Sequence, residues 1–84
     1  RSVKLMKQIE VTARFTSAGK IIPLKFNDGK SARKVYHVGR QWHDQQGKHI
    51  LVMDIQRKTY HLVFDFQECV WYLENIPQMP NSPV

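Results

Sequence analysis

Two adjacent segments near the C-terminus have the polarity pattern of paired strands, and they constrain the fold more than any other part of the chain. In residues 59–66, apolar side chains recur at every second position, from Tyr60 through Leu62 to Phe64. Residues 69–76 follow after a short turn and contain the run Val-Trp-Tyr-Leu. A period of two residues is the repeat of a strand, and β-branched and aromatic side chains favour strands. The chain is therefore expected to fold as a compact β domain.

Four earlier segments also have strand character and are separated by turn signals such as Asp28-Gly29. Pro23 cannot donate to a strand ladder, so we expect its strand to be short, at an edge or bulged. Gly39 interrupts another segment, where we expect a bulge or a sharp bend. The expected strands cover residues 8–16, 21–27, 32–43, 49–55, 59–66 and 69–76.

Six short strands, with no segment that reads as a helix of ordinary length, favour a barrel over a flat sheet whose edges would stay unpaired. We predict one all-β domain over residues 8–76, a small six-stranded antiparallel barrel of SH3-like or comparable topology. Residues 1–7 are expected to form an irregular lead-in, and residues 77–84, which contain three prolines, a flexible tail. The side chains expected in or near the core are those of Phe15, Leu24, Phe26, Tyr36, Trp42, Leu51, Met53, Leu62, Phe64, Trp71 and Leu73.

The positive charge of the chain is concentrated in its first half. Net charge is +6, and residues 1–40 contain ten Lys and Arg against two acidic residues, whereas residues 41–84 contain three against five. A basic region concentrates phosphates through long-range attraction and counterion release. This asymmetry favours a polyanionic partner, and nucleic acid is the leading class.

The candidate nucleic-acid-binding residues are cations of the first half that accompany Tyr36 and Trp42. Single-stranded nucleic acid is commonly held by a positive groove and by aromatic faces on which bases stack. The candidates are Arg14, Lys25, Lys30, Arg33, Lys34 and Arg40. In the alternative interpretation the two aromatic residues belong to the core and the lysines are solvated. Tyr36 and Trp42 are an even number of residues apart and would share one face of a strand, which favours this alternative. If the candidates bind, replacing Arg33 and Lys34 by alanine should weaken polyanion binding and leave the melting temperature nearly unchanged.

Catalysis and metal binding are not indicated by the sequence. No phosphate-binding loop, serine elbow or dinucleotide glycine pattern is present, so we expect no enzyme and no cofactor. The four histidines, His37, His43, His49 and His61, have no close ligand spacing, so we expect them to be solvated or hydrogen-bonded rather than metal ligands. Cys69, the only cysteine, is expected to be a small buried residue, and it implies a reducing, cytosolic setting.

Several segments resemble a family of small uncharacterised bacterial domains over residues 20–76. Its members have an arginine-rich strand ahead of a tryptophan and end in a Trp-Tyr-Leu-Glu strand. In this chain the corresponding segments are Arg-Lys-Val-Tyr-His-Val at 33–38, Trp42, residues 60–65, and Trp-Tyr-Leu-Glu at 71–74. The resemblance implies a compact β domain without an established activity. Some members are encoded near genes for error-prone DNA polymerases, which implies a role in DNA repair or replication.

A protein-interaction module is the alternative to a nucleic-acid-binding module. The proline-interrupted strand could accept a partner strand at its edge, and residues 77–84 could occupy a groove of another protein. No apolar run approaches the roughly 18 residues of a membrane span, so no membrane partner is expected. Polyanion binding should fall steeply with added salt, whereas an apolar interface should not. The sequence sets no oligomeric state.

Overall fold

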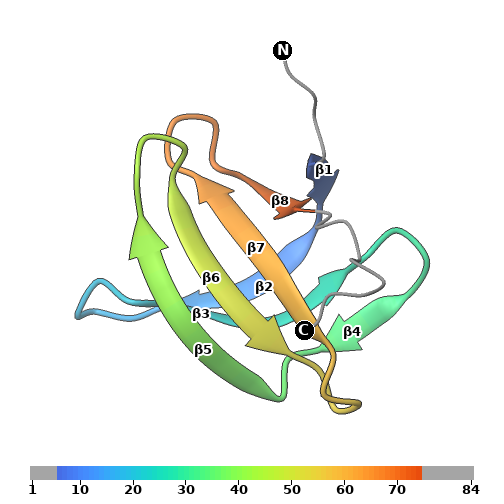
Figure 1. The fold of residues 1–84 in the computed structure, drawn as a ribbon. Helices are drawn as coiled ribbons and strands as arrows, with labels where there is room; N and C mark the ends of the chain where they lie inside the picture. Colours follow the sequence, from blue (N-terminus) through green and yellow to red (C-terminus); the bar gives the residue numbers. More distant parts are fainter. Residues whose placement is uncertain (1–5, 75–84) are drawn as a thin grey trace, which may run out of the picture.

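The computed structural model describes residues 6–74, and every regular element in this range is a β-strand (Figure 1). The all-β class is thus confirmed. The expected tail at 77–84 and residues 1–5 of the expected lead-in lie outside the described range. The strands are β1 (Met6–Ile9), β2 (Val11–Phe15), β3 (Ile21–Asn27), β4 (Ala32–Lys34), β5 (His37–His43), β6 (Lys48–Met53), β7 (Thr59–Asp65) and β8 (Val70–Glu74). Among the described residues no helix is long and apolar enough to span a membrane.

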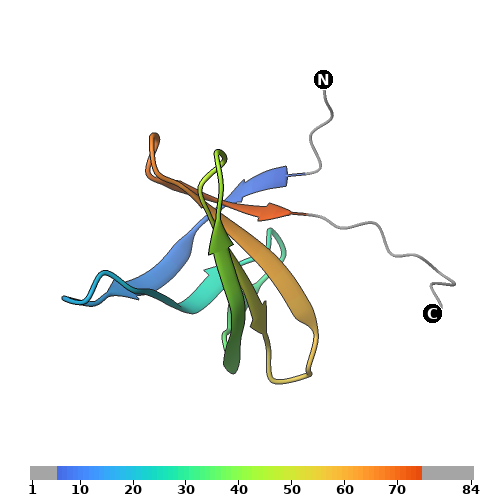
Figure 2. The ribbon, with the colours of Figure 1, turned by 60° about the vertical axis from the view of Figure 1, so that its left-hand side comes forward.

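The strands form two antiparallel sheets of eight strands in all rather than the predicted six-stranded barrel. The larger sheet has the order β1-β8-β7-β6-β5, and the smaller sheet has the order β2-β3-β4. In Figure 1 strands β2 and β3 cross behind the larger sheet, and Figure 2 shows the β2–β3 turn projecting beyond the other strands. The predicted barrel was therefore wrong, and the likeness to SH3-like topology stays a prediction.

Two bends explain why eight strands replace the six that were predicted. The expected strand 8–16 breaks at Glu10, so that β1 pairs with β8 while β2 pairs with β3. The expected strand 32–43 breaks after Val35, whose N–H donates to Leu24 O in the smaller sheet at 2.9 Å. The next residue, Tyr36, donates instead to Met53 O in the larger sheet at 2.8 Å. Each long predicted strand therefore passes from one sheet to the other, and both sheets keep their backbone hydrogen bonds.

The core lies between the two sheets and contains part of the predicted set. Buried hydrophobic side chains come from both sheets: Ile21, Phe26, Ile50, Val52, Leu62 and Trp71. Phe26, Leu62 and Trp71 were predicted correctly, and Phe64 and Leu73 pack against this core while partly exposed. Phe15, Leu24 and Tyr36 were predicted wrongly, because their exposed fractions are 62%, 43% and 68%.

Strand irregularities account for the wrong core assignments in β3 and confirm two other predictions. The register between β2 and β3 shifts where Thr12 faces Lys25 and Ala13 faces Pro23, so Leu24 is an extra residue that turns outward. Pro23 is fully buried instead. The expected bulge at Pro23 is thus confirmed, and so is the one at Gly39, because the β5–β6 register shifts between Val38 and Gln41.

Candidate functional site

Arg33 belongs to the structural framework rather than to an open cationic surface. Its Nε donates to Asp28 Oδ2 at 2.6 Å, and its Nη1 lies 3.7 Å from Asp54 Oδ2. The hydrogen bond from Arg33 is the main reason why the pKa of Asp28 lies well below its usual range. The same hydrogen bond raises the pKa of Arg33. Two carboxylates therefore neutralise this guanidinium, which links the β3–β4 turn to the β6–β7 turn.

Asp54 is buried and uses both of its carboxylate oxygens. Oδ1 accepts the backbone N–H groups of Gln56 and Lys58, each at 2.9 Å, and Oδ2 accepts the Tyr60 hydroxyl at 3.2 Å. These hydrogen bonds, first of all that from Lys58, lower the pKa of Asp54. Removing Arg33 would leave this buried carboxylate without its nearest cation, so replacing Arg33 and Lys34 together should lower stability, contrary to the expectation from the sequence.

Three of the six predicted cations share one exposed surface, the outer face of the smaller sheet. Lys25 and Lys34 are register partners across β3 and β4, and Thr12 is the partner of Lys25 on β2. Residues at paired positions point to the same side of a sheet, and Arg14 follows Thr12 with the strand period of two. All four side chains are exposed, while Val11 and Ala13, which alternate with Thr12 and Arg14 along β2, pack against the core. We call Thr12, Arg14, Lys25 and Lys34 the basic face.

The basic face keeps its positive charge within the described part of the chain. The ion pairs found there involve Arg33, His49 and His61, and none involves a cation of the basic face. Glu10 lies at one margin, where it lines a shallow cavity of about 200 Å³ together with Thr12 and Lys25. Like charges directly opposite each other destabilise a strand pair, so the Lys25–Lys34 pair has a cost that a bound anion would remove.

The remaining predicted cations lie elsewhere. Lys30 is in the β3–β4 turn, where its backbone N–H donates to Asp28 Oδ1 at 2.9 Å. Lys7 from β1 reaches the same turn, because its Nζ lies 2.7 Å from the position that a Cβ on Gly29 would take. Sequence reasoning did not select Lys7, since only the tertiary arrangement brings β1 to this turn. Arg40 lies in the larger sheet with its guanidinium 5.1 Å from the centre of the Trp42 ring.

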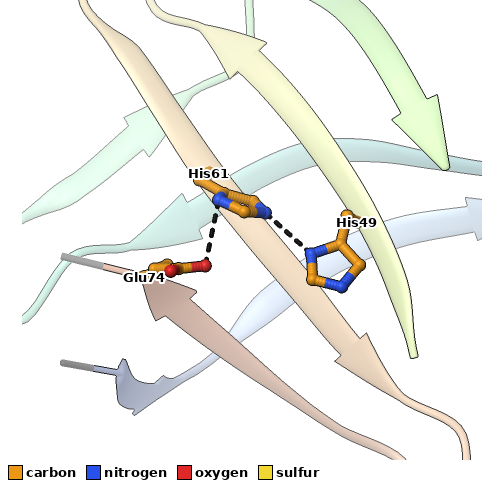
Figure 3. Close-up of side chains that lie close together, drawn as sticks. All are labelled: His49, His61 and Glu74. Carbon is orange, nitrogen blue, oxygen red and sulfur yellow. Dashed lines mark hydrogen bonds and ion pairs between the residues drawn. The ribbon is translucent and has the colours of Figure 1, made fainter. Parts of the chain in front are cut away.

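A second group of polar side chains crosses the larger sheet on the side opposite to the core (Figure 3). Asp44 Oδ1 lies 2.9 Å from His49 Nε2, and His49 Nδ1 lies 2.8 Å from His61 Nε2. His61 Nδ1 lies 3.0 Å from Glu74 Oε1. The Trp42 ring stacks on His49 with 5.0 Å between ring centres and 4° between planes. The outer nitrogens of the two imidazoles therefore each lie against a carboxylate, and the indole of Trp42 covers one face of His49.

The environment of this histidine pair differs from that of the other histidines. His49 is buried, and only 11% of the His61 side chain is exposed, whereas His37 and His43 are exposed. Burial lowers the pKa of His61, with the charge of Glu74 acting in the opposite direction, and the hydrogen bond from His49 lowers the pKa of Asp44. The hydrogen bonds of His49 and His61 and the exposure of His37 and His43 agree with part of the expectation, and the expected absence of metal ligation stays a prediction. The proximity of His49, His61 and Glu74 was missed, because it depends on the β6–β7–β8 register.

Cys69 occupies a different position from the one predicted. It is exposed, with a positive φ of 57°, in the turn between β7 and β8. Its N–H donates to Asp65 O at 2.8 Å, while Asp65 Oδ1 accepts the N–H groups of Gln67 and Glu68. The expectation of a buried cysteine was wrong, because these hydrogen bonds place the residue in the turn before the strand begins.

Comparisons with known proteins add no relative: no family model, no curated protein and no solved structure matches this chain. The resemblance to the small bacterial domains stays a prediction.

Proposed function

We propose that this protein is a non-catalytic module that binds nucleic acid through the basic face. The observation that carries the proposal is the direct cross-strand pairing of Lys25 with Lys34, both exposed and both without an ion pair to a described carboxylate. Cross-strand partners have Cβ atoms about 5 Å apart, so one phosphate can reach both ammonium groups. Binding a phosphate there removes the repulsion between the lysines and releases counterions.

Exposed apolar side chains that are close in sequence to the residues of the basic face favour a single-stranded ligand. Tyr36 follows Lys34 by two residues, and Leu24 precedes Lys25, with exposed fractions of 68% and 43%. An unpaired base stacked on an aromatic side chain contributes roughly 1–3 kcal/mol, whereas a duplex keeps its bases stacked inside. We therefore expect tighter binding to single strands than to duplexes of the same length. A role in DNA repair or replication rests on the family resemblance alone.

The experiment is a salt series of fluorescence anisotropy titrations with a labelled single-stranded oligonucleotide. Two phosphate contacts on a single strand, one shared by Lys25 and Lys34 and one at Arg14, give a slope of log K against log salt of about −1.4, or roughly a sevenfold loss of affinity between 50 and 200 mM salt. Lys25→Ala with Lys34→Ala leaves one contact, so this loss should shrink to about threefold.

A matched control removes the same charge from another exposed site. Arg57 and Lys58 lie in the β6–β7 turn and are both exposed. Arg57 has a positive φ of 69°, so Arg57→Gly with Lys58→Ala removes two charges without straining the backbone. This variant should keep nearly the full salt slope. Equal weakening by both double variants would show that net charge alone is responsible, and the proposed face would be rejected.

The second candidate is a protein partner, which an exposed aromatic group favours. Phe15 and Phe66 are 62% and 52% exposed, and both rings make edge contacts with Phe64, at 5.8 and 5.9 Å between centres. Exposed apolar patches often mark interaction sites. The protein-interaction alternative, by edge-strand or groove recognition, predicts a partner whose binding is insensitive to salt and is lost in Phe15→Ser.

A further inference from the structure

We propose that His49, His61 and Glu74 form a binding site for a divalent transition-metal ion of the zinc class. The three residues come from the adjacent strands β6, β7 and β8, and Figure 3 shows the His61 ring between the other two side chains. Each residue offers one ligand atom, and these atoms all lie within 4.8 Å of one another. Two imidazoles and one carboxylate are a ligand set that suits zinc and leaves a coordination position open.

Each ring has one nitrogen beside a carboxylate, and its other nitrogen faces the second ring, where both could bind one ion. Asp44 Oδ1 accepts from His49 Nε2, so the lone pair of His49 is at Nδ1 whenever the ring is neutral. Glu74 Oε1 lies 3.0 Å from His61 Nδ1, so His61 would bind the ion through Nε2, and the Glu74 carboxylate has to turn from Nδ1 toward the ion to serve as the third ligand. A carboxylate on the outer nitrogen of a metal-binding histidine fixes its tautomer and orientation.

The metal would take the place of the proton that His49 and His61 now share. The 2.8 Å contact between His49 Nδ1 and His61 Nε2 requires one N–H donor. Zinc–nitrogen bonds of about 2.0–2.1 Å in tetrahedral geometry put two ligand nitrogens about 3.3 Å apart, so the two nitrogens need to separate by about 0.5 Å and the rings to turn until both lone pairs point at the ion. Metal binding would displace this proton from between the rings, because a ligating nitrogen must be deprotonated.

The surroundings favour this site over the other histidines of the chain. His49 and His61 have only 5% and 11% of their side chains exposed, and Trp42 stacks on His49 with 4° between the planes. A ring with restricted motion loses less freedom on binding. His37 and His43 are exposed. The proposed metal site lies in the larger sheet and shares no residue with the basic face, so it stands independently of the proposed function.

The test is isothermal titration calorimetry of the full chain with ZnCl₂. The expected result is one zinc per chain. Co²⁺ in place of Zn²⁺ should give the intense visible absorption of a four-coordinate site. His61→Gln should abolish both signals, and Glu74→Gln should weaken zinc binding at least tenfold, the lower end of the effect expected for removing such a carboxylate.

Two controls keep the test decisive. His37→Gln with His43→Gln removes the two exposed histidines and should leave the zinc affinity unchanged. Thermal unfolding of each metal-free variant shows whether it folds, and if His61→Gln does not, Glu74→Gln decides, because that side chain is 34% exposed and its amide can still accept from His61. Absence of one-to-one binding, or binding that survives Glu74→Gln undiminished and disappears in the double control, would overturn the proposal.

Discussion

Replacing Gly47 by alanine is expected to destabilise the fold more than any other single change of comparable size. Gly47 is buried immediately before β6, with φ at +145°, where it closes a tight turn with Asp44. Asp44 N–H donates to Gly47 O at 3.0 Å, and Gly47 N–H donates to Asp44 O at 3.2 Å. This turn also places the Asp44 carboxylate against His49. The variant therefore tests the local backbone that supports the histidine pair.

The magnitude follows from what the added Cβ would meet. It would lie 2.0 Å from Phe64 O and 2.9 Å from Phe64 C, both backbone atoms of the neighbouring strand β7. A positive φ costs a side-chain-bearing residue about 1–3 kcal/mol, and forcing the strands apart costs about 1–3 kcal/mol more. The total of about 2–6 kcal/mol is a large part of the stability of a small domain, which is about 4–13 kcal/mol at this length.

Gly19→Ala is the matched control for this prediction. Gly19 also has a positive φ, +85°, but a Cβ there would meet nothing within 4 Å. Its cost should be the backbone term alone, about 1–2 kcal/mol. Urea unfolding followed by tryptophan fluorescence measures both variants. If Gly47→Ala lost no more than Gly19→Ala, the close approach of β7 to this turn would be refuted.

Further expectations concern the ion-pair framework, the basic face and the core. Arg33→Gln should lower the urea midpoint, because it removes the cation between two carboxylates, whereas Lys34→Ala should change stability by no more than about 0.5 kcal/mol. The pKa of Asp28 is lower in the folded protein than its ordinary value of 3.8, so its contribution to stability is complete above about pH 5 and is lost as the pH falls further; Asp28→Asn should flatten this acid-side decline in urea midpoints. Ile50→Ala should cost about 2–5 kcal/mol by the same assay, since the side chain is fully buried, while Leu24→Ala should cost less than about 1 kcal/mol.

Local patterns predicted the strands well but not which sheet each strand joins. The alternation in residues 8–16 continues through Glu10, and nothing in the side chains marks the bend there. The bend is set by β8 and β3, which pair with the two halves of this segment and lie far apart in the sequence. The extra residue Leu24 likewise reverses which residues of β3 face the core after Pro23. Alternation counted along the sequence therefore assigns some buried side chains to the exposed face.

The candidate sites show the same division between local and tertiary information. Charge asymmetry selected Lys25, Lys34 and Arg14, and the register brings these three to one face. The charge asymmetry also selected Arg33. The sequence does not show that the carboxylate of Asp54 lies beside Arg33, because only the fold brings the two residues together. The histidine pair could not be found by spacing, since residues on neighbouring strands meet through register rather than through a fixed separation in the chain.

The proposed binding of nucleic acid by the basic face of the smaller sheet is tested most directly by a ¹H–¹⁵N NMR titration with a short single-stranded oligonucleotide at low salt. We expect the amide shifts to concentrate on Thr12, Arg14, Lys25 and Lys34 and to disappear as salt is added. Shifts centred on the Arg57–Lys58 turn, or a spectrum that the oligonucleotide leaves unchanged, would contradict it.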